Sequence, residues 1–197
     1  MKKGRVYTIV FMLIISAVFA LLLASANAYF LPKIQENELL DERVAILYVF
    51  DIDQSGSPEE ILDRFEKNVS ETIIEGIDLY EYTSADKKAI AYAVPFTGAG
   101  LWGSISGYMG VTDDFKQITG LVFTDQSETP GLGGRIDELA YREQFKDLRI
   151  KEGKPLAYGE DGIDAITGAT LTSNSVLRIL NELLADTISE LEEVSND

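Results

Sequence analysis

Four hydroxyl side chains gather near the C-terminus, in the segment DAITGATLTS at residues 164–173. They are Thr167, Thr170, Thr172 and Ser173. The Gly168-Ala169 step lets the backbone approach a ligand closely, and an apolar pattern with helical spacing follows it. Because a helix N-terminus offers unpaired N–H groups and a partial positive charge, this segment suits a phosphate group. Ser, Thr and Asn are also the common capping residues, so an ordinary helix cap within residues 172–174 is the alternative.

Two further glycine-rich segments occur where strands are expected to end. FTDQSETPGLGGRI, residues 123–136, passes from a strand into a Pro-Gly and Gly-Gly loop. FTGAGLWGSISGYMG, residues 96–110, contains Trp102, the only tryptophan of the chain. Glycines around an aromatic ring suit a flat ligand laid against that ring. Taken singly, the two segments also fit an ordinary turn and a tryptophan that anchors the core or the surface.

The composition excludes much of the usual catalytic chemistry. The chain of 197 residues has no Cys and no His, so thiolate nucleophiles, imidazole bases, iron–sulfur clusters, zinc sites and His-ligated haem lack their ligands. Any redox chemistry therefore needs an organic cofactor. A net charge of −16 also argues against nucleic-acid binding, because such a surface repels a phosphate backbone.

Taken together and in this order, GAGLWG, SETPGLGG and DAITGATLTSNS resemble the FMN-binding domain family over roughly residues 96–184. The resemblance is to the type found in the C subunit of the Na⁺-translocating NADH:quinone reductase and in the G subunit of the Rnf electron-transport complex. It implies that FMN is esterified through its phosphate to Thr170, the last residue of TGAT, by a dedicated flavin transferase.

The same resemblance implies the other cofactor-binding residues. Those expected to contact the isoalloxazine are Trp102, Glu128, Thr129, Leu132, Gly133 and Leu171. Those expected near the phosphate and ribityl chain are Thr167, Gly168, Ala169, Thr172 and Ser173. Lys154 is a candidate for the polar edge of the flavin. No side chain is expected to act as a catalytic base or metal ligand, because the flavin itself changes oxidation state.

The N-terminus is predicted to be a membrane anchor. After Lys2, Lys3 and Arg5 the chain is uncharged from Val6 to Pro32, which is long enough to cross a hydrocarbon core of about 30 Å. The positive-inside rule predicts a cytoplasmic N-terminus, in a bacterial-type inner membrane, with the domain on the extracytoplasmic side. The predicted divisions are a cytoplasmic end (1–5), a transmembrane helix (6–32), a stalk (33–56), the FMN-binding domain (57–192) and an acidic tail (193–197). A signal peptide cleaved after Ala26-Asn27-Ala28 is the alternative.

The domain itself is predicted to be α+β, with a central antiparallel sheet and flanking helices. Runs rich in β-branched and aromatic residues predict strands at 78–83, 87–96, 103–112 and 117–124, with hairpin turns at 84–87 and 113–117. Apolar periodicity predicts helices at 57–73, 135–148 and 172–193. The first has Ser57 as its N-cap, and the third carries its apolar stripe on Val176, Leu180, Leu183, Thr187 and Leu191.

These observations predict a membrane-anchored flavoprotein subunit with covalent FMN that relays electrons within an ion-translocating respiratory complex of Rnf or Na⁺-translocating quinone-reductase type. Its partners would be other membrane subunits of that complex and, for maturation, the flavin transferase. Such a chain is an electron carrier rather than a complete enzyme. The alternatives are an exported acidic binding or assembly module without a redox cofactor, and a free-standing flavin electron carrier.

Overall fold

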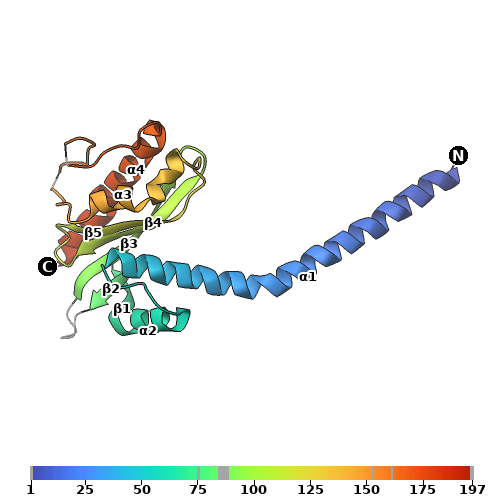
Figure 1. Ribbon diagram of the computed structural model, residues 1–197, viewed down its shortest axis with the longest axis horizontal. Helices are drawn as coiled ribbons and strands as arrows, with labels where there is room; N and C mark the ends of the chain where they lie inside the picture. Colours follow the sequence, from blue (N-terminus) through green and yellow to red (C-terminus); the bar gives the residue numbers. More distant parts are fainter. Residues whose placement is uncertain (1, 75, 84–88, 152, 161, 196–197) are drawn as a thin grey trace. The chain divides into compact units, whose positions relative to one another are not determined.

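The computed structural model describes residues 2–74, 76–83, 89–151, 153–160 and 162–195 (Figure 1). The chain divides into two compact units, residues 1–40 and 41–197. The first unit lies within the helix α1 (Lys2–Val49). By length and composition α1 is apolar enough to cross a membrane, with a mean hydropathy of 2.8 in its most apolar stretch, whose residues are not buried. An apolar helix with exposed side chains all round is typical of a lipid-facing segment.

The second unit is built on a five-stranded antiparallel sheet in the order β1-β2-β3-β4-β5. The strands are β1 (Val69–Ile74), β2 (Ile77–Thr83), β3 (Ala89–Ala99), β4 (Ser104–Thr112) and β5 (Ile118–Asp125). The predicted α+β class with a central antiparallel sheet is therefore confirmed. The predicted turn at 113–117 joins β4 to β5, where Thr112 Oγ1 donates to Asp114 Oδ1 over 2.6 Å. The predicted turn at 84–87 lies outside the described residues.

The first predicted helix is shorter than expected, because its last part is a strand. Helix α2 (Pro58–Asn68) begins with a capping box in which Ser57 and Glu60 bond to each other's backbone N–H groups. The prediction of a helix to residue 73 is wrong, since the chain turns extended at Val69 and continues as β1. The sequence VSETII of β1 is rich in β-branched residues, which favour a pleated strand over a helix.

The second predicted helix, residues 135–148, is also wrong as a continuous element. It is divided into η1 (Gly133–Asp137), α3 (Leu139–Arg142) and η2 (Glu143–Phe145). Glu138 is extended between the first two. Each short turn buries one large side chain, Ile136, Tyr141 and Phe145 in order. These three residues are spaced by five and then four positions, which does not keep them on one face of a single straight helix. The helix is therefore interrupted, and all three side chains are buried.

The last helix starts earlier than predicted and contains a π-helical turn. It consists of α4 (Thr170–Leu183), the π-helical turn η3 (Leu184–Ile188) and α5 (Ser189–Ser195). The π turn adds one residue, so the buried position after Leu183 is Ile188 and not Thr187, which is half-buried. Of the predicted stripe, Val176, Leu180, Leu183 and Leu191 are buried, and only Thr187 is replaced in the core, by Ile188. The last two residues of the acidic tail lie outside the described part of the chain.

Helices cover both faces of the sheet (Figure 1). Helices α3 and α4 lie on one face, where Phe96 and Met109 are buried in the same core as Leu180. Helix α2 lies on the opposite face, together with residues 41–49 of α1. Thr119 Oγ1 of β5 donates to the Val49 carbonyl over 2.7 Å.

Two strand glycines allow this close approach of α1 to the sheet. A Cβ on Gly120 would lie 2.8 Å from Val49 Cα, and one on Gly110 would lie 2.7 Å from the Val49 carbonyl oxygen. Farther back along the helix, Glu42 Oε1 accepts hydrogen bonds from Tyr80 Oη at 3.1 Å and Tyr108 Oη at 2.6 Å. Residues 41–49, within the segment predicted as a stalk, are thus part of the folded second unit.

The buried tyrosine Tyr141 should make stability fall at high pH. Its side chain is buried, and its hydroxyl lies 2.7 Å from that of Tyr158. Burial first, and then the neighbouring Tyr158, raise the pKa of Tyr141 well above its ordinary value of 10.0. Below pH 10 both folded and unfolded chains keep this proton. Above it the unfolded chain loses the proton first, so the free energy of unfolding falls, by at most about 1.4 kcal/mol per pH unit for one such group.

Denaturant unfolding between pH 8 and 11 measures this effect. The slope of unfolding free energy against pH above 10 should be smaller in Tyr141→Phe than in the wild type. Below pH 9 the two curves should run parallel, separated only by the lost hydrogen bond to Tyr158. Equal slopes above pH 10 would contradict the assignment.

Candidate functional site

The three glycine-containing motifs meet at one cleft of about 370 Å³. Its lining residues are Leu101, Trp102, Thr129, Leu132, Gly133, Gly168, Ala169, Thr170, Leu171 and Thr172. The first two come from the hairpin tip between β3 and β4, and the next three from the segment after β5. The rest come from the turn before α4 and from its first residues. Segments that lie far apart in sequence, from Leu101 to Thr172, therefore form a single concave surface.

Large apolar side chains at this cleft are left open to solvent. Trp102 is 69% exposed, Leu171 is 63% exposed and Leu132 is 46% exposed. A folded domain usually buries such side chains, and a group of them around a concave surface is typical of a binding site. The arrangement suits a flat aromatic ligand, with an indole ring and two leucines available as apolar walls.

The structure separates the four hydroxyls that the sequence places together. Thr172 is buried, and its Oγ1 donates to Glu128 Oε2 over 2.5 Å. Ser173 is fully buried, and its Oγ accepts a hydrogen bond from the Ile166 N–H over 3.0 Å. Thr170 is exposed and lines the cleft. Of these four residues, only Thr170 and Thr167 are exposed, and Thr167 lines a different pocket from the cleft.

The helix does not use a hydroxyl as its cap. Helix α4 begins at Thr170, its N-cap is Ala169, and no side-chain cap bond is present at this position. The predicted cap within residues 172–174 is therefore wrong. The Ser173 N–H donates to the Ala169 carbonyl over 3.0 Å, which is the first hydrogen bond of the helix. The N–H groups of the three residues before Ser173 therefore have no partner within the helix. Gly168, with φ of +82°, makes the turn that brings the chain into this position.

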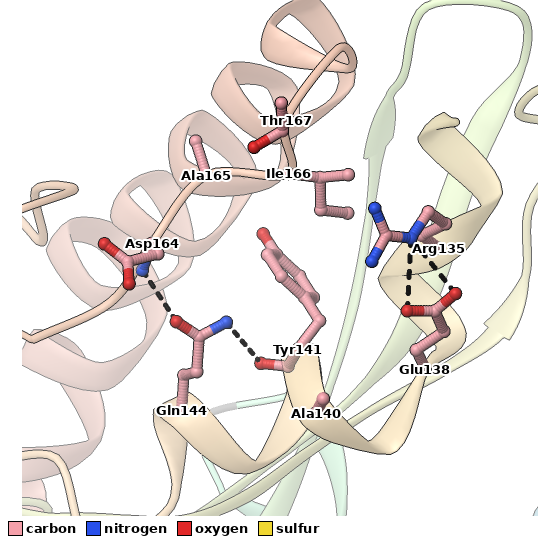
Figure 2. A pocket seen from close by; sticks show the side chains of 9 residues that line it. All are labelled: Arg135, Glu138, Ala140, Tyr141, Gln144, Asp164, Ala165, Ile166 and Thr167. Carbon is pink, nitrogen blue, oxygen red and sulfur yellow. Dashed lines mark hydrogen bonds and ion pairs between the residues drawn. The ribbon is translucent and has the colours of Figure 1, made fainter. Parts of the chain in front are cut away.

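Thr167 lines a separate small pocket of about 180 Å³ beside the segment that leads to the cleft (Figure 2). Gln144 holds this segment, because its Oε1 accepts from the Asp164 N–H over 2.7 Å. On the other side of the pocket Arg135 Nε and Glu138 Oε1 form an ion pair at 3.1 Å. Figure 2 shows the Tyr141 side chain between Gln144 and the Arg135–Glu138 pair, pointing toward residues 165 and 166.

Four predicted residues do not line the cleft, namely Thr167, already described, and Lys154, Glu128 and Ser173. Lys154 forms an ion pair with Glu160, Nζ to Oε2 at 3.5 Å, and lines a different cavity of about 550 Å³ near Asn181 and Ile188. These last residues lie beyond the middle of α4 and in η3, far along the chain from its start. Glu128 is buried behind the cleft rather than in its wall. Ser173 is likewise buried behind it.

Leu101 is a lining residue that the sequence reasoning missed. It is 45% exposed and precedes Trp102 at the hairpin tip. An apolar residue next to a tryptophan within a glycine-rich turn was the available signal, since a turn at the surface seldom needs two large apolar side chains.

The match with known proteins agrees with this geometry. Residues 100–185 match the FMN-binding domain family, and that range includes every lining residue of the cleft. The resemblance inferred from the three motifs is thus confirmed.

Individual relatives of similar sequence are C subunits of the Na⁺-translocating NADH-quinone reductase. The chain is 42% identical over 93 residues to the C subunit of the Na⁺-translocating NADH-quinone reductase of Pasteurella multocida (strain Pm70), covering 42% of this chain and 36% of the relative. It is 34% identical over 104 residues to the same subunit of Vibrio anguillarum, covering 47% and 41%. The alignments thus span well under half the length of these curated relatives.

Solved structures extend the likeness over more of the chain. The C subunit of the Na⁺-translocating NADH-quinone reductase from Parabacteroides distasonis ATCC 8503 superposes with a TM-score of 0.64 at 26% identity, covering 80% of this chain and 94% of that one. Shewanella oneidensis NqrC gives a TM-score of 0.65 at 20% identity, covering 80% and 98%. The fold described above is therefore the fold of these subunits.

Proposed function

We propose that this chain is a membrane-anchored flavoprotein subunit that carries FMN on Thr170 and relays electrons within an ion-translocating respiratory complex. The observation that carries the proposal is the cleft itself, where an exposed threonine hydroxyl stands between exposed apolar walls at the start of a helix. The likeness to quinone-reductase subunits favours a Na⁺-translocating complex over an Rnf-type complex. In either complex the chain is a carrier rather than a complete enzyme.

The residues present fit FMN in size and chemistry. A cleft of about 370 Å³ lies within the usual range of about 300–1,000 Å³ for small-molecule sites. Trp102, Leu132 and Leu171 supply apolar surface for a tricyclic ring. The free amides at the start of α4 suit a phosphate bound at Thr170. FMN, when bound, supplies the redox chemistry that this composition otherwise lacks.

Attachment to Thr170 requires an activated flavin and a separate catalyst. The Thr170 oxygen would form a bond to the flavin phosphorus as a phosphoanhydride bond of the dinucleotide donor breaks. The remainder of the donor would leave as a nucleoside monophosphate, with the proton of the Thr170 hydroxyl. We assign the catalysis of this step to the flavin transferase, with this chain as its protein substrate. An exposed hydroxyl is a requirement for such a substrate, and Thr170 meets it.

The membrane placement is part of the same proposal. Residues 1–5 would be cytoplasmic, 6–32 would span the inner membrane, and 33–56 would form a stalk whose residues 41–49 pack on the sheet. The domain at 57–192 and the tail at 193–197 would lie on the extracytoplasmic side. The basic residues ahead of the apolar segment support this orientation.

Co-expression with a flavin transferase tests the proposal. The full chain should give a band with flavin fluorescence on a denaturing gel under ultraviolet light, together with a mass increase of one FMN ester. A chain that stays without flavin in the presence of an active transferase would favour the alternative of an acidic binding or assembly module.

Purification from native membranes separates the remaining alternatives. A subunit of a larger complex should copurify in fixed ratio with other redox subunits, whose identity distinguishes the quinone-reductase type from the Rnf type. A flavin-loaded chain that elutes alone under mild detergent would instead favour a free-standing electron carrier.

A further inference from the structure

One buried carboxylate connects all three segments of the cleft. Glu128 belongs to the loop after β5 and is only 4% exposed. Its Oε1 accepts hydrogen bonds from the N–H groups of Leu101, at 2.7 Å, and Trp102, at 3.1 Å. Its Oε2 accepts the hydroxyl proton of Thr172 at 2.5 Å. The loop is thereby bonded to the hairpin tip through one oxygen and to helix α4 through the other.

The surroundings leave this carboxylate little freedom to move. A Cβ on Gly100 would lie 2.5 Å from Glu128 Oε1, and one on Gly133 would lie 2.8 Å from Oε2 and closer still to Thr172 Oγ1. The Glu128 N–H is itself bonded to Gln126 Oε1 over 2.6 Å. The absence of a side chain at both glycines therefore leaves room for the carboxylate. Both the backbone N–H and the carboxylate of Glu128 are held by hydrogen bonds.

The chemistry of the three bonds calls for an acceptor at both oxygens. A carboxylate offers only acceptors, and here it meets two backbone donors and one hydroxyl donor. Hydrogen bonds to an ionised acceptor are stronger than neutral ones, and a buried donor left without its partner is costly. Removing the carboxylate would therefore release the hairpin tip and α4 from the loop at once.

We propose that Glu128 is a positioning residue that fixes Trp102 and Thr170 relative to one another, and that it does not itself contact the flavin. It acts through the two backbone amides at the hairpin tip and through Thr172, two residues after the attachment site in α4. The part of this proposal that concerns flavin attachment rests on the proposed function. The part that concerns the position of Trp102 does not, because it applies to the chain without flavin.

The single tryptophan gives a direct measurement on the flavin-free chain. The full chain is purified in detergent without any transferase, and the time-resolved fluorescence anisotropy of Trp102 is recorded. Glu128→Leu should increase the amplitude of the fast local motion. Glu128→Gln should stay close to the wild type, because its carbonyl oxygen can still accept from both amides while the Thr172 hydroxyl turns to accept from the new amide group. Glu190→Leu, the same substitution at an exposed glutamate of α5, is the control and should leave the anisotropy unchanged.

A second pair of variants keeps the test decisive should Glu128→Leu fail to fold. Thr172→Val removes the hydroxyl with little change of shape, whereas Thr172→Ser keeps it. The initial rate of flavin attachment by the transferase should fall about tenfold or more in Thr172→Val, since a small misplacement of a reacting group is costly, and should recover in Thr172→Ser.

The outcomes separate the two proposals. Unchanged Trp102 anisotropy in a folded Glu128→Leu chain would overturn the positioning role, as would equal attachment rates in Thr172→Val and Thr172→Ser. Failure of the wild type to accept flavin would overturn the proposed function alone, because the anisotropy measurement does not depend on flavin.

Discussion

Thr170→Ala is expected to abolish covalent flavin completely. The substituted chain has no oxygen at this position to form the ester, and the two nearest following hydroxyls, of Thr172 and Ser173, are buried and already hydrogen-bonded. Alanine also suits a first helical position, so the fold should be kept. After co-expression with the transferase, both gel fluorescence and the FMN mass increase should be absent.

Peptide mapping makes this prediction specific to one residue. Trypsin should release residues 152–178 as one peptide, because Pro155 protects the bond after Lys154. Fragmentation of this peptide from the wild type should place the FMN mass on Thr170. Thr124→Ala, at an exposed threonine of β5 outside the cleft, is the matched control and should keep the adduct. An adduct on Thr167, or one that survives in Thr170→Ala, would show that the anchor has been assigned to the wrong residue.

Leu180→Ala is expected to cause a large loss of stability and, through it, a loss of flavin attachment. Leu180 is fully buried in α4, in the core between this helix and the sheet. Truncating a buried leucine to alanine removes apolar contacts and leaves a cavity, which costs about 2–5 kcal/mol. Because α4 also carries Thr170, a weakened contact with the sheet disturbs the cleft as well.

Denaturant unfolding of the full chain in detergent measures this loss. The matched control is Leu139→Ala, the same truncation at a leucine that is 51% exposed. It should change the unfolding free energy by no more than about 0.5 kcal/mol. A loss in Leu180→Ala as small as that in Leu139→Ala would mean that the packing of α4 on the sheet contributes little to stability.

Much of the fold could be predicted because its signals are local. Strands β2 to β5 are alternating runs of β-branched and aromatic residues between turn residues, and each lies within a few residues of its predicted range. The cap of α2 was equally local, since Ser57, Pro58 and Glu60 form it without help from distant residues. The motifs of the cleft were visible for a similar reason, as glycines and hydroxyls stand close together in each.

What could not be predicted depends on contacts between distant segments. The strand β1 is chosen over a longer helix because it pairs with β2, Val69 opposite Tyr82. The π turn η3 exists because Ile188 and not Thr187 fills the core. Lys154 is near the last motif in sequence, yet the chain carries it to another cavity. Glu128 was expected at the flavin ring, and only the folded arrangement reveals its bonds to Leu101, Trp102 and Thr172.

The packing of Val49 against Gly110 and Gly120 has a consequence for how substitutions on the two faces of the sheet combine. The end of α1 occupies one face of the sheet, while the cleft is formed with α4, which packs on the opposite face. The sheet thus separates residues 41–49 from the cleft. Substitutions at Thr119 and at the cleft should accordingly have additive effects on stability.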